Sequence, residues 1–193
     1  DAFAGEKSEP TFDTVSPGIV RNTSKCVLCG RCVETCMKVQ GLGVLGYMNR
    51  GFKTKVAPIY DKSFDDVNCM QCGQCINVCP VGALQEKEEV HNVIAALNDD
   101  SKHVVQTAPG VRGALGEEFG MPMGTRVTGK MVHALKLVGF DKVYDTNFGA
   151  DLTIMEEGYE FLNRLQNQGT LPMITSCSPG WVNYVEHEYP DLL

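Results

Sequence analysis

Two runs of cysteine share one spacing and contain eight of the nine cysteines in this chain. They are Cys26-x2-Cys29-x2-Cys32-x3-Cys36 and Cys69-x2-Cys72-x2-Cys75-x3-Cys79, the second followed directly by Pro80. This is the ligand spacing of a cubane iron–sulfur cluster, and in a duplicated run the fourth cysteine ligates the other cluster. The spacing therefore predicts two [4Fe-4S] clusters. The first set of ligands is Cys26, Cys29, Cys32 and Cys79, and the second set is Cys69, Cys72, Cys75 and Cys36.

The residues around the cysteines suit a backbone that wraps closely around a cluster. Gly30 and Gly73 each follow the second cysteine of a run, where a missing side chain lets amide N–H groups approach the cluster sulfurs. We expect the fourth cysteine of each run to open the following short helix. Zinc sites usually take cysteines in separated pairs, and disulfide frameworks suit short secreted chains. The two complete runs favour cubane clusters over both alternatives.

Charge and composition exclude several functional classes. The formal net charge of −7 argues against binding to nucleic acid or to a membrane surface. No apolar stretch approaches the roughly 18 residues of a membrane span, and no signal peptide is recognised. The chain begins with Asp1 rather than Met, so we expect an internal start. Clusters with thiolate ligands add negative charge, so we expect an electron partner with a basic face.

The pattern of residues divides the chain near residue 90. Residues 1–20 carry two prolines, a glycine and no periodic pattern, which predicts an irregular lead-in. Residues 21–88 are predicted to form a ferredoxin-like α+β domain, with short strands and turns between the two cysteine runs. Residues 89–193 are predicted to form an α/β lobe.

Helix and strand patterns alternate in this second part. We predict helices at 91–97, 111–119, 129–138 and about 151–165, and strands at 103–108, 142–146 and 171–175. Strands separated by helices of this length form a parallel sheet through right-handed crossovers. Functional groups gather at the carboxyl ends of such strands, where residues 107–110 and 175–181 are located.

Three blocks of the sequence, together with the cysteine runs, resemble the catalytic subunit of an [FeFe]-hydrogenase. They are TAPGVRGALGEEFG at 107–120, FGADLTIMEE at 148–157 and PMITSCSPGW at 172–181. The resemblance implies a two-cluster ferredoxin-like domain followed by an α/β parallel-sheet lobe, an incomplete hydrogenase large-subunit fold. It also implies reversible conversion of two protons and two electrons to H2 at an H-cluster. In that cofactor a cysteine bridges a cubane to a two-iron unit that carries CO and cyanide.

The resemblance assigns roles to Cys177 and Ser178. The family's block reads T-S-C-C-P-x-W, in which the first cysteine relays protons and the second ligates the H-cluster cubane. Cys177 therefore corresponds to the relay thiol, and Ser178 occupies the ligand position. A serine oxygen is a harder and poorer ligand for iron than a thiolate. Three explanations stay open: a natural variant, an engineered Cys→Ser change, or a shifted register in which Cys177 is itself the ligand.

The resemblance also implies a proton path and a cofactor pocket. Glu157 corresponds to the carboxylate that accepts the proton from Cys177, with Glu160 and Arg164 leading outward on the same helical face. An exposed salt-bridge face is the alternative for these three residues. Pro109 is expected to pack over the two-iron unit, and Gly110 offers only its N–H where the family often has a small polar side chain.

Two functions follow from the resemblance. The first is an oxidoreductase, part of an [FeFe]-hydrogenase whose two cubanes relay electrons between a ferredoxin or an NAD(P)H-oxidising subunit and the H-cluster. The family's remaining H-cluster ligands come from two later motifs, so a C-terminal part is expected in the same or a separate chain. The second is a non-catalytic sensory or electron-transfer protein, and a cluster-assembly relative is a lesser alternative. We expect a cytoplasmic location, with the periplasm as the alternative if a partner exports the protein.

Overall fold

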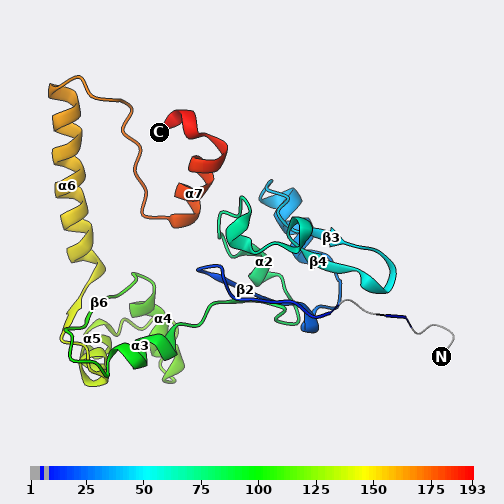
Figure 1. The fold of residues 1–193 in the computed structure, drawn as a ribbon. Coiled ribbons are helices and arrows are strands. Elements are labelled where there is room, and N and C mark those ends of the chain that lie inside the picture. Colours follow the sequence, from blue (N-terminus) through cyan, green and yellow to red (C-terminus); the bar gives the residue numbers. More distant parts are fainter. Residues whose placement is uncertain (1–4, 7–8) are drawn as a thin grey trace. The chain divides into compact units, whose positions relative to one another are not determined.

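The computed structural model describes residues 5–6 and 9–193 and divides the chain into two compact units (Figure 1). The first unit combines the residues up to 88 with residues 174–193, and the second unit is formed by residues 89–173. The predicted segments 1–20, 21–88 and 89–193 remain predictions. Among the described residues, no helix combines the length and the apolar character that crossing a membrane requires.

The first unit contains a three-stranded antiparallel sheet. Its strands are β1 (Phe12–Asp13), β2 (Ile19–Asn22) and β5 (Leu84–Glu86), in the order β1-β2-β5. Alternate residues of β2 point to opposite faces, so Ile19 and Arg21 are buried together on one of them. β1 and the start of β2 fall within the segment expected to be irregular.

A hairpin of β3 (Gly46–Met48) and β4 (Lys55–Ala57) separates the two cysteine runs. This confirms the short strands predicted there. Single 3-10 turns connect the remaining parts of the unit. They are η1 (Thr23–Lys25), η3 (Gly51–Lys53), η4 (Ile59–Asp61) and η5 (Phe64–Asp66).

Each cysteine run contains a short helix that begins directly after its glycine. These are α1 (Arg31–Glu34), which continues into the π-helical η2 (Thr35–Val39), and α2 (Gln74–Asn77). The expectation that the fourth cysteine opens the helix was wrong. The third cysteine lies in the first turn instead, because the glycine in a left-handed conformation starts the helix one residue later.

The core of the first unit is built around the cysteines. Cys32 and Cys75 are buried among Ile19, Val33, Leu45, Val56, Phe64 and Leu84, and four further cysteines pack against this cluster. The C-terminal elements α7 (Pro179–Glu188) and η6 (Pro190–Leu192) belong to the same unit. The cysteines are therefore part of the folded core.

The second unit is an α/β arrangement with one parallel strand pair. Its elements are α3 (Val90–Ala96), β6 (Val104–Gln106), α4 (Val111–Glu118), α5 (Thr128–Val138), β7 (Lys142–Tyr144) and α6 (Thr146–Gln166). β6 and β7 are parallel, with Val105 opposite Val143. The first two predicted strands, their parallel pairing and the four predicted helices are confirmed.

Two details of the second part differ from the prediction. The strand expected at residues 171–175 does not form; these residues are irregular, and Pro172 has no N–H to contribute to a sheet. Helix α6 begins at Thr146, earlier than expected, because the side chain of Asp145 caps its first turn by accepting a hydrogen bond from the Asn147 N–H.

Candidate iron–sulfur cluster sites

The two cysteine runs have matching backbone conformations around their second cysteine. Leu28 and Gln71 precede the second cysteine of each run, and both have φ of 56°. Gly30 and Gly73 follow that cysteine with φ of 76° and 70°. Alternation of left- and right-handed residues turns successive N–H groups toward one point and creates a concave site for an anion. Both runs therefore present the type of loop that receives an iron–sulfur cluster.

The cysteines nearest to Cys32 come from both runs. Burial, with added repulsion from the thiols of Cys26, Cys79 and Cys29, raises the pKa of Cys32 to about 11. The electrostatic neighbours of Cys32 are thus the other three cysteines of the predicted first set, including Cys79 from the second run.

A corresponding environment surrounds Cys75. Burial, with repulsion from the thiols of Cys69, Cys72, Cys32 and Cys36, raises its pKa to about 12. Burial also raises the pKa of Cys69, with contributions from Cys36 and Cys72. The second set therefore gathers around Cys75 in the same way. Cys32 acts on Cys75 as well, which places the two sets side by side in one core.

The turn after Pro80 stabilises a thiolate at Cys79. Burial opposes ionisation, but backbone N–H groups of residues 81–84 outweigh it and hold the pKa of Cys79 below its usual value. One of these groups, the N–H of Ala83, donates to Cys79 Sγ at 3.3 Å. A thiolate is the form that binds metal, and N–H···S hydrogen bonds tune the potential of a bound cluster.

A cavity of about 440 Å³, including space open to solvent, contains all four cysteines of the first set. Apolar side chains of Val56, Ala83 and Leu84 form much of its wall, together with Arg21. No three His, Cys, Asp or Glu side chains in the described ranges converge as the ligands of a single metal ion do. A single zinc requires sulfurs about 2.3 Å from one centre, whereas a cubane distributes its ligands over four irons.

These residues fit [4Fe-4S] clusters. Each set offers four soft thiol ligands of the kind that select iron–sulfur clusters. The concave loops supply amide N–H groups, and the bound iron supplies the positive charge that the buried thiols require to ionise. When bound, each cluster exchanges one electron at a time.

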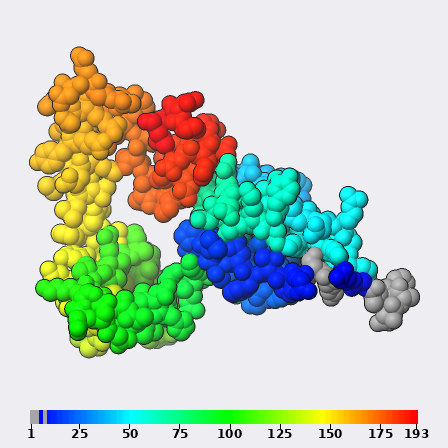
Figure 2. Space-filling model, viewed as in Figure 1, coloured from blue at the N-terminus to red at the C-terminus, as the bar shows by residue number. Residues whose placement is uncertain are grey.

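The segment with Cys177 and Ser178 lies in the same unit as both cysteine sets. Cys177 is exposed, and Ser178 is the N-cap residue of α7, its N–H donating to Ser176 Oγ at 3.0 Å. A Cβ added to Gly180 would lie 3.1 Å from the carbonyl oxygen of Met70. Figure 2 shows the red C-terminal residues against the teal residues of the second run.

A second cavity is formed along this contact. Its lining residues are Gln40, Met70, Gln71, Cys72, Ser178, Pro179, Gly180, Trp181 and Tyr184. The structure therefore brings Ser178 to the loop that carries Cys72, a cysteine of the second set.

The remaining predicted site residues belong to the second unit. Pro109 and Gly110 are exposed and precede α4. Arg112 fixes this loop: its Nε donates to the Pro109 carbonyl at 3.2 Å, and its Nη1 lies 3.2 Å from Asp145 Oδ1. Arg112 was missed in the sequence, although its position after a strand and at the start of a helix was a usable signal.

The three residues of the predicted proton path lie along α6. Glu160 and Arg164 form an ion pair, with Arg164 Nε donating to Glu160 Oε1 at 3.0 Å. Arg164 Nη1 also donates to the carbonyl of Thr170 at 3.3 Å, and Glu157 is half-buried one turn earlier. The structure thus brings Glu160 and Arg164 together, and a path to Cys177 remains a prediction.

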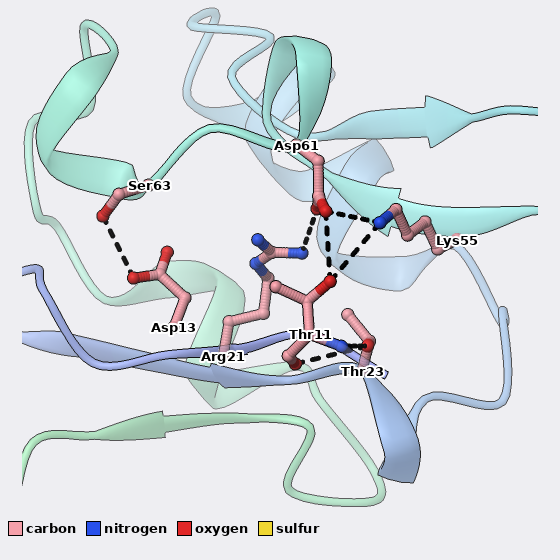
Figure 3. Close-up of polar contacts among 7 residues, drawn as sticks. All are labelled: Thr11, Asp13, Arg21, Thr23, Lys55, Asp61 and Ser63. Atoms are coloured by element: carbon pink, nitrogen blue, oxygen red, sulfur yellow. Dashed lines mark hydrogen bonds and ion pairs between the residues drawn. The ribbon is translucent and has the colours of Figure 1, made fainter. Parts of the chain in front are cut away.

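Sequence analysis also missed a polar group beside the first set. Figure 3 shows Arg21, Asp61 and Lys55 meeting in the first unit, with Thr11 bound to the same carboxylate. The sequence separation between Arg21 and Asp61 leaves no local pattern. The one available signal is a charged residue at a position of β2 that alternation assigns to the buried face.

Two thiol tetrads in a ferredoxin-like fold, followed by an α/β unit, define an iron–sulfur protein. Residues 101–193 match the family of the iron only hydrogenase large subunit, C-terminal domain. Residues 16–85 match the ferredoxin-like domain of NADH-quinone oxidoreductase subunit 3. Over nearly its whole length the chain is homologous to the large subunit of iron-only, or [FeFe], hydrogenases, which confirms the resemblance, the ferredoxin-like part and the hydrogenase-like α/β part.

Curated relatives support this assignment over nearly the whole chain. The NADP-reducing hydrogenase subunit HndD of Solidesulfovibrio fructosivorans is 51% identical over 98% of this chain and 33% of its own length. Iron hydrogenase 1 of Clostridium pasteurianum is 49% identical over 94% of this chain and 32% of its own. The chain thus spans about a third of the length of these relatives. A solved variant of [FeFe]-hydrogenase HydA1 from Chlamydomonas reinhardtii is 46% identical over 55% of this chain and 29% of its own, with a TM-score of 0.47.

Proposed function

We propose that this chain relays electrons through two [4Fe-4S] clusters to and from the H-cluster of an [FeFe]-hydrogenase, which interconverts protons and H2. The observation that carries the proposal is the contact between the start of α7 and the loop of Cys72. It joins the second set of cysteines to the segment whose family counterpart holds the H-cluster. An electron on the second cluster would therefore lie beside the active-site segment.

The first set is suited to receive electrons from outside. Cys29 is exposed, whereas Cys32 and Cys75 are buried. A partner that docks over Cys29 would pass electrons to the first cluster, then to the second and on toward Ser178. The partner we propose is a ferredoxin or an NAD(P)H-oxidising subunit, and the relative HndD is named as a subunit of an NADP-reducing hydrogenase.

When bound, the H-cluster would supply the metal centre for the chemistry of protons and electrons. Cys177 is exposed at the end of its loop, so its thiol is free to hold a proton and deliver it. In this proposal Glu157 exchanges that proton with Cys177, Glu160 passes it toward solvent, and the permanently charged Arg164 orients Glu160. The ion pair holds the Glu160 carboxylate in place on this path.

Pro109 and Gly110 would line one side of the site of the two-iron unit. A Cβ at Gly110 would meet no atom within 4 Å, so the backbone there is open to a ligand from the N-terminal side of α4. The Arg112 contacts to Pro109 and Asp145 would hold this loop in position during turnover.

A non-catalytic function is the alternative, and Ser178 favours it. Its side chain makes no capping hydrogen bond, so the hydroxyl stands where the family's ligand thiol stands without a structural reason to be serine. A protein without the H-cluster would keep the two cubanes as a sensory or electron-transfer module. The cytoplasmic location also stays a proposal, since one relative is named as a periplasmic [Fe] hydrogenase large subunit.

Infrared spectroscopy separates these functions. The sample is the large subunit that contains this segment, matured and purified without oxygen. Bands of iron-bound CO and cyanide, with H2 evolution from a reduced dye, would support the hydrogenase. A spectrum without such bands, from protein that holds both cubanes, would contradict it and leave the electron carrier.

Replacing Ser178 in the same subunit tests the ligand assignment. Ser178→Cys should raise the occupancy of the H-cluster cubane if residue 178 is the ligand position. Cys177→Ala is the matched change one residue earlier; it should lower turnover and leave cubane occupancy unchanged. Loss of the cubane in Cys177→Ala, with no gain in Ser178→Cys, would mean that Cys177 is itself the ligand.

A further inference from the structure

Arg21 is a buried cation in the middle of the first unit. Arg21 is 2% exposed. It lies on β2, where it pairs with Asp13 of β1 on one side and with Leu84 of β5 on the other. A guanidinium is essentially always charged, and burying an unpaired charge is strongly unfavourable. Its surroundings must therefore compensate the charge.

Asp61 compensates one side of this guanidinium. Arg21 Nη1 lies 2.9 Å from Asp61 Oδ1 (Figure 3). The other oxygen of Asp61 accepts from Thr11 Oγ1 at 3.1 Å and binds Lys55. Within the described part of the chain, Arg21 Nε and Nη2 have no hydrogen-bond partner. Two buried donors without acceptors are costly. Asp13 Oδ2, on the neighbouring strand, is also buried without a hydrogen-bond partner among the described residues.

Arg21 also borders the cluster cavity. Arg21 lines the cavity that contains Cys26, Cys29, Cys32 and Cys79. Lys55 lines a neighbouring cavity that also includes Cys26. Neither Asp61 nor Asp13 is among the lining residues of these two cavities. Of this group of two cations and two carboxylates, only the cations border these two cavities.

We propose that the buried positive charge of Arg21, at the wall of the cavity that contains the first set of cysteines, raises the reduction potential of the first cluster. The cluster with four thiolates is an anion and gains one negative charge when an external one-electron donor reduces it. A nearby cation stabilises the reduced form more than the oxidised form. No proton is transferred in this step.

Asp61 moderates this effect. Its carboxylate pairs with the same guanidinium and cancels part of the positive field at the cavity. Lys55 and Thr11 hold the carboxylate in place from the opposite side. Arg21 and Asp61 therefore have opposite effects on the reduction potential of the first cluster.

The second cysteine run has no cation at the corresponding position. Arg21 stands five residues before Cys26, and Phe64 stands five residues before Cys69. Phe64 is fully buried in the same core. Phe64 is therefore a matched control position: equally buried, equally placed in the repeat, and uncharged.

The test is a potentiometric titration of the reconstituted chain, followed by electron paramagnetic resonance of the reduced clusters. It compares Arg21→Met, Arg21→Lys, Asp61→Asn and Phe64→Leu with the parent. Arg21→Met should make reduction of one cluster about tenfold less favourable, a shift of about 59 mV for one electron. Arg21→Lys should recover part of this shift, and Asp61→Asn should shift the same cluster in the opposite direction. Phe64→Leu should leave that potential unchanged.

The affected cluster is identified with Cys79→Ser, which removes a ligand of the first set and should eliminate the shifting signal. Equal shifts of both clusters, or shifts of the same sign in Arg21→Met and Asp61→Asn, would overturn the proposal. If Arg21→Met does not hold clusters, Asp61→Asn decides alone, and an unchanged or lowered potential refutes the inference. The proposal rests on cluster binding and not on H2 chemistry: a parent chain without clusters would refute the proposed relay, whereas clusters with unshifted potentials would refute only the role of Arg21.

Discussion

Leu28 and Gln71 have the same left-handed backbone conformation, with φ of 56° in both, although one side chain is apolar and the other polar. Ordinary residues pay a cost for this conformation, and here it precedes the second cysteine in each run. The glycines that follow, Gly30 and Gly73, repeat the correspondence. The duplication in sequence is thus a duplication of backbone shape, fixed by the same need to turn N–H groups toward a cluster.

The two glycines should differ in their tolerance of a side chain. A Cβ at Gly73 would meet no atom within 4 Å, so Gly73→Ala should cost only the left-handed strain, about 1 kcal/mol. A Cβ at Gly30 would clash with the Tyr47 hydroxyl, so Gly30→Ala should cost more. Denaturant unfolding of the cluster-loaded protein measures both. In a Tyr47→Phe background the cost of Gly30→Ala should fall toward that of Gly73→Ala; an unchanged cost would contradict the contact.

Asp61 should make the first unit sensitive to acid. Burial opposes its ionisation, but hydrogen bonds from Lys55, Arg21 and Thr11 outweigh burial and lower its pKa. A lowered pKa in the folded state contributes stability above the unfolded value of 3.8, and this contribution is lost as the pH falls through the folded pKa. Denaturant midpoints from about pH 7 to about pH 4 and below should therefore show this loss only at the acid end.

Asp61→Asn should remove this component and destabilise the protein at neutral pH by about 3 kcal/mol, because buried Arg21 loses its partner. The exposed Asp65 provides the control, and Asp65→Asn should change stability by less than about 0.5 kcal/mol. Equal effects of the two substitutions would show that the buried pair has no special contribution.

The ion pair on α6 should matter for proton transfer and not for stability. Glu160 and Arg164 are four residues apart, and the Glu160 side chain is exposed, so Glu160→Gln should cost less than about 0.5 kcal/mol. In the complete enzyme we predict about a hundredfold slower H2 evolution. Glu156→Gln, an exposed change on the same helix, should affect neither quantity. An unchanged rate of H2 evolution in Glu160→Gln would mean that the pair is an exposed salt bridge with no part in proton transfer.

Trp181 should report on the second cluster. It is the only tryptophan of the chain and lines the cavity that contains Cys72. An iron–sulfur cluster beside it should quench its fluorescence by energy transfer. Cys75→Ser, which removes a ligand of the second set, should therefore restore more emission than Cys26→Ser, which removes one of the first. Equal recovery in the two variants would argue against the contact between α7 and the second run.

Local patterns predicted much of this fold. The cysteine spacing indicates the cluster loops, and the alternation of short apolar runs with helical spacing indicates β6, β7 and their parallel pairing. The strand expected at 171–175 failed because an apolar run with Pro172 has no partner strand in the described residues. The early start of α6 was readable in principle, since Asp145 is a standard helix-capping residue.

Local sequence patterns could not predict the polar group around Arg21. Arg21 and Asp61 meet only because β2 and the turn η4 fold onto each other, which no short segment encodes. The contact of Gly180 with Met70 is of the same kind: it joins residues far apart in the chain. Some predicted roles depend on such long-range contacts. Those of Cys177 and Glu157 follow from the family resemblance alone.

Crossed ligation of two cubanes is the central claim, and paired cysteine substitutions with iron analysis and Mössbauer spectroscopy test it most directly. The parent chain should hold about eight irons, four in each cubane. Cys26→Ser combined with Cys79→Ser removes two ligands of one set, so one complete cubane and about four irons should remain. Cys75→Ser combined with Cys79→Ser removes a ligand from each set, and both cubanes should be lost. The reverse result, with a cubane retained in the second pair and none in the first, would contradict the crossed arrangement.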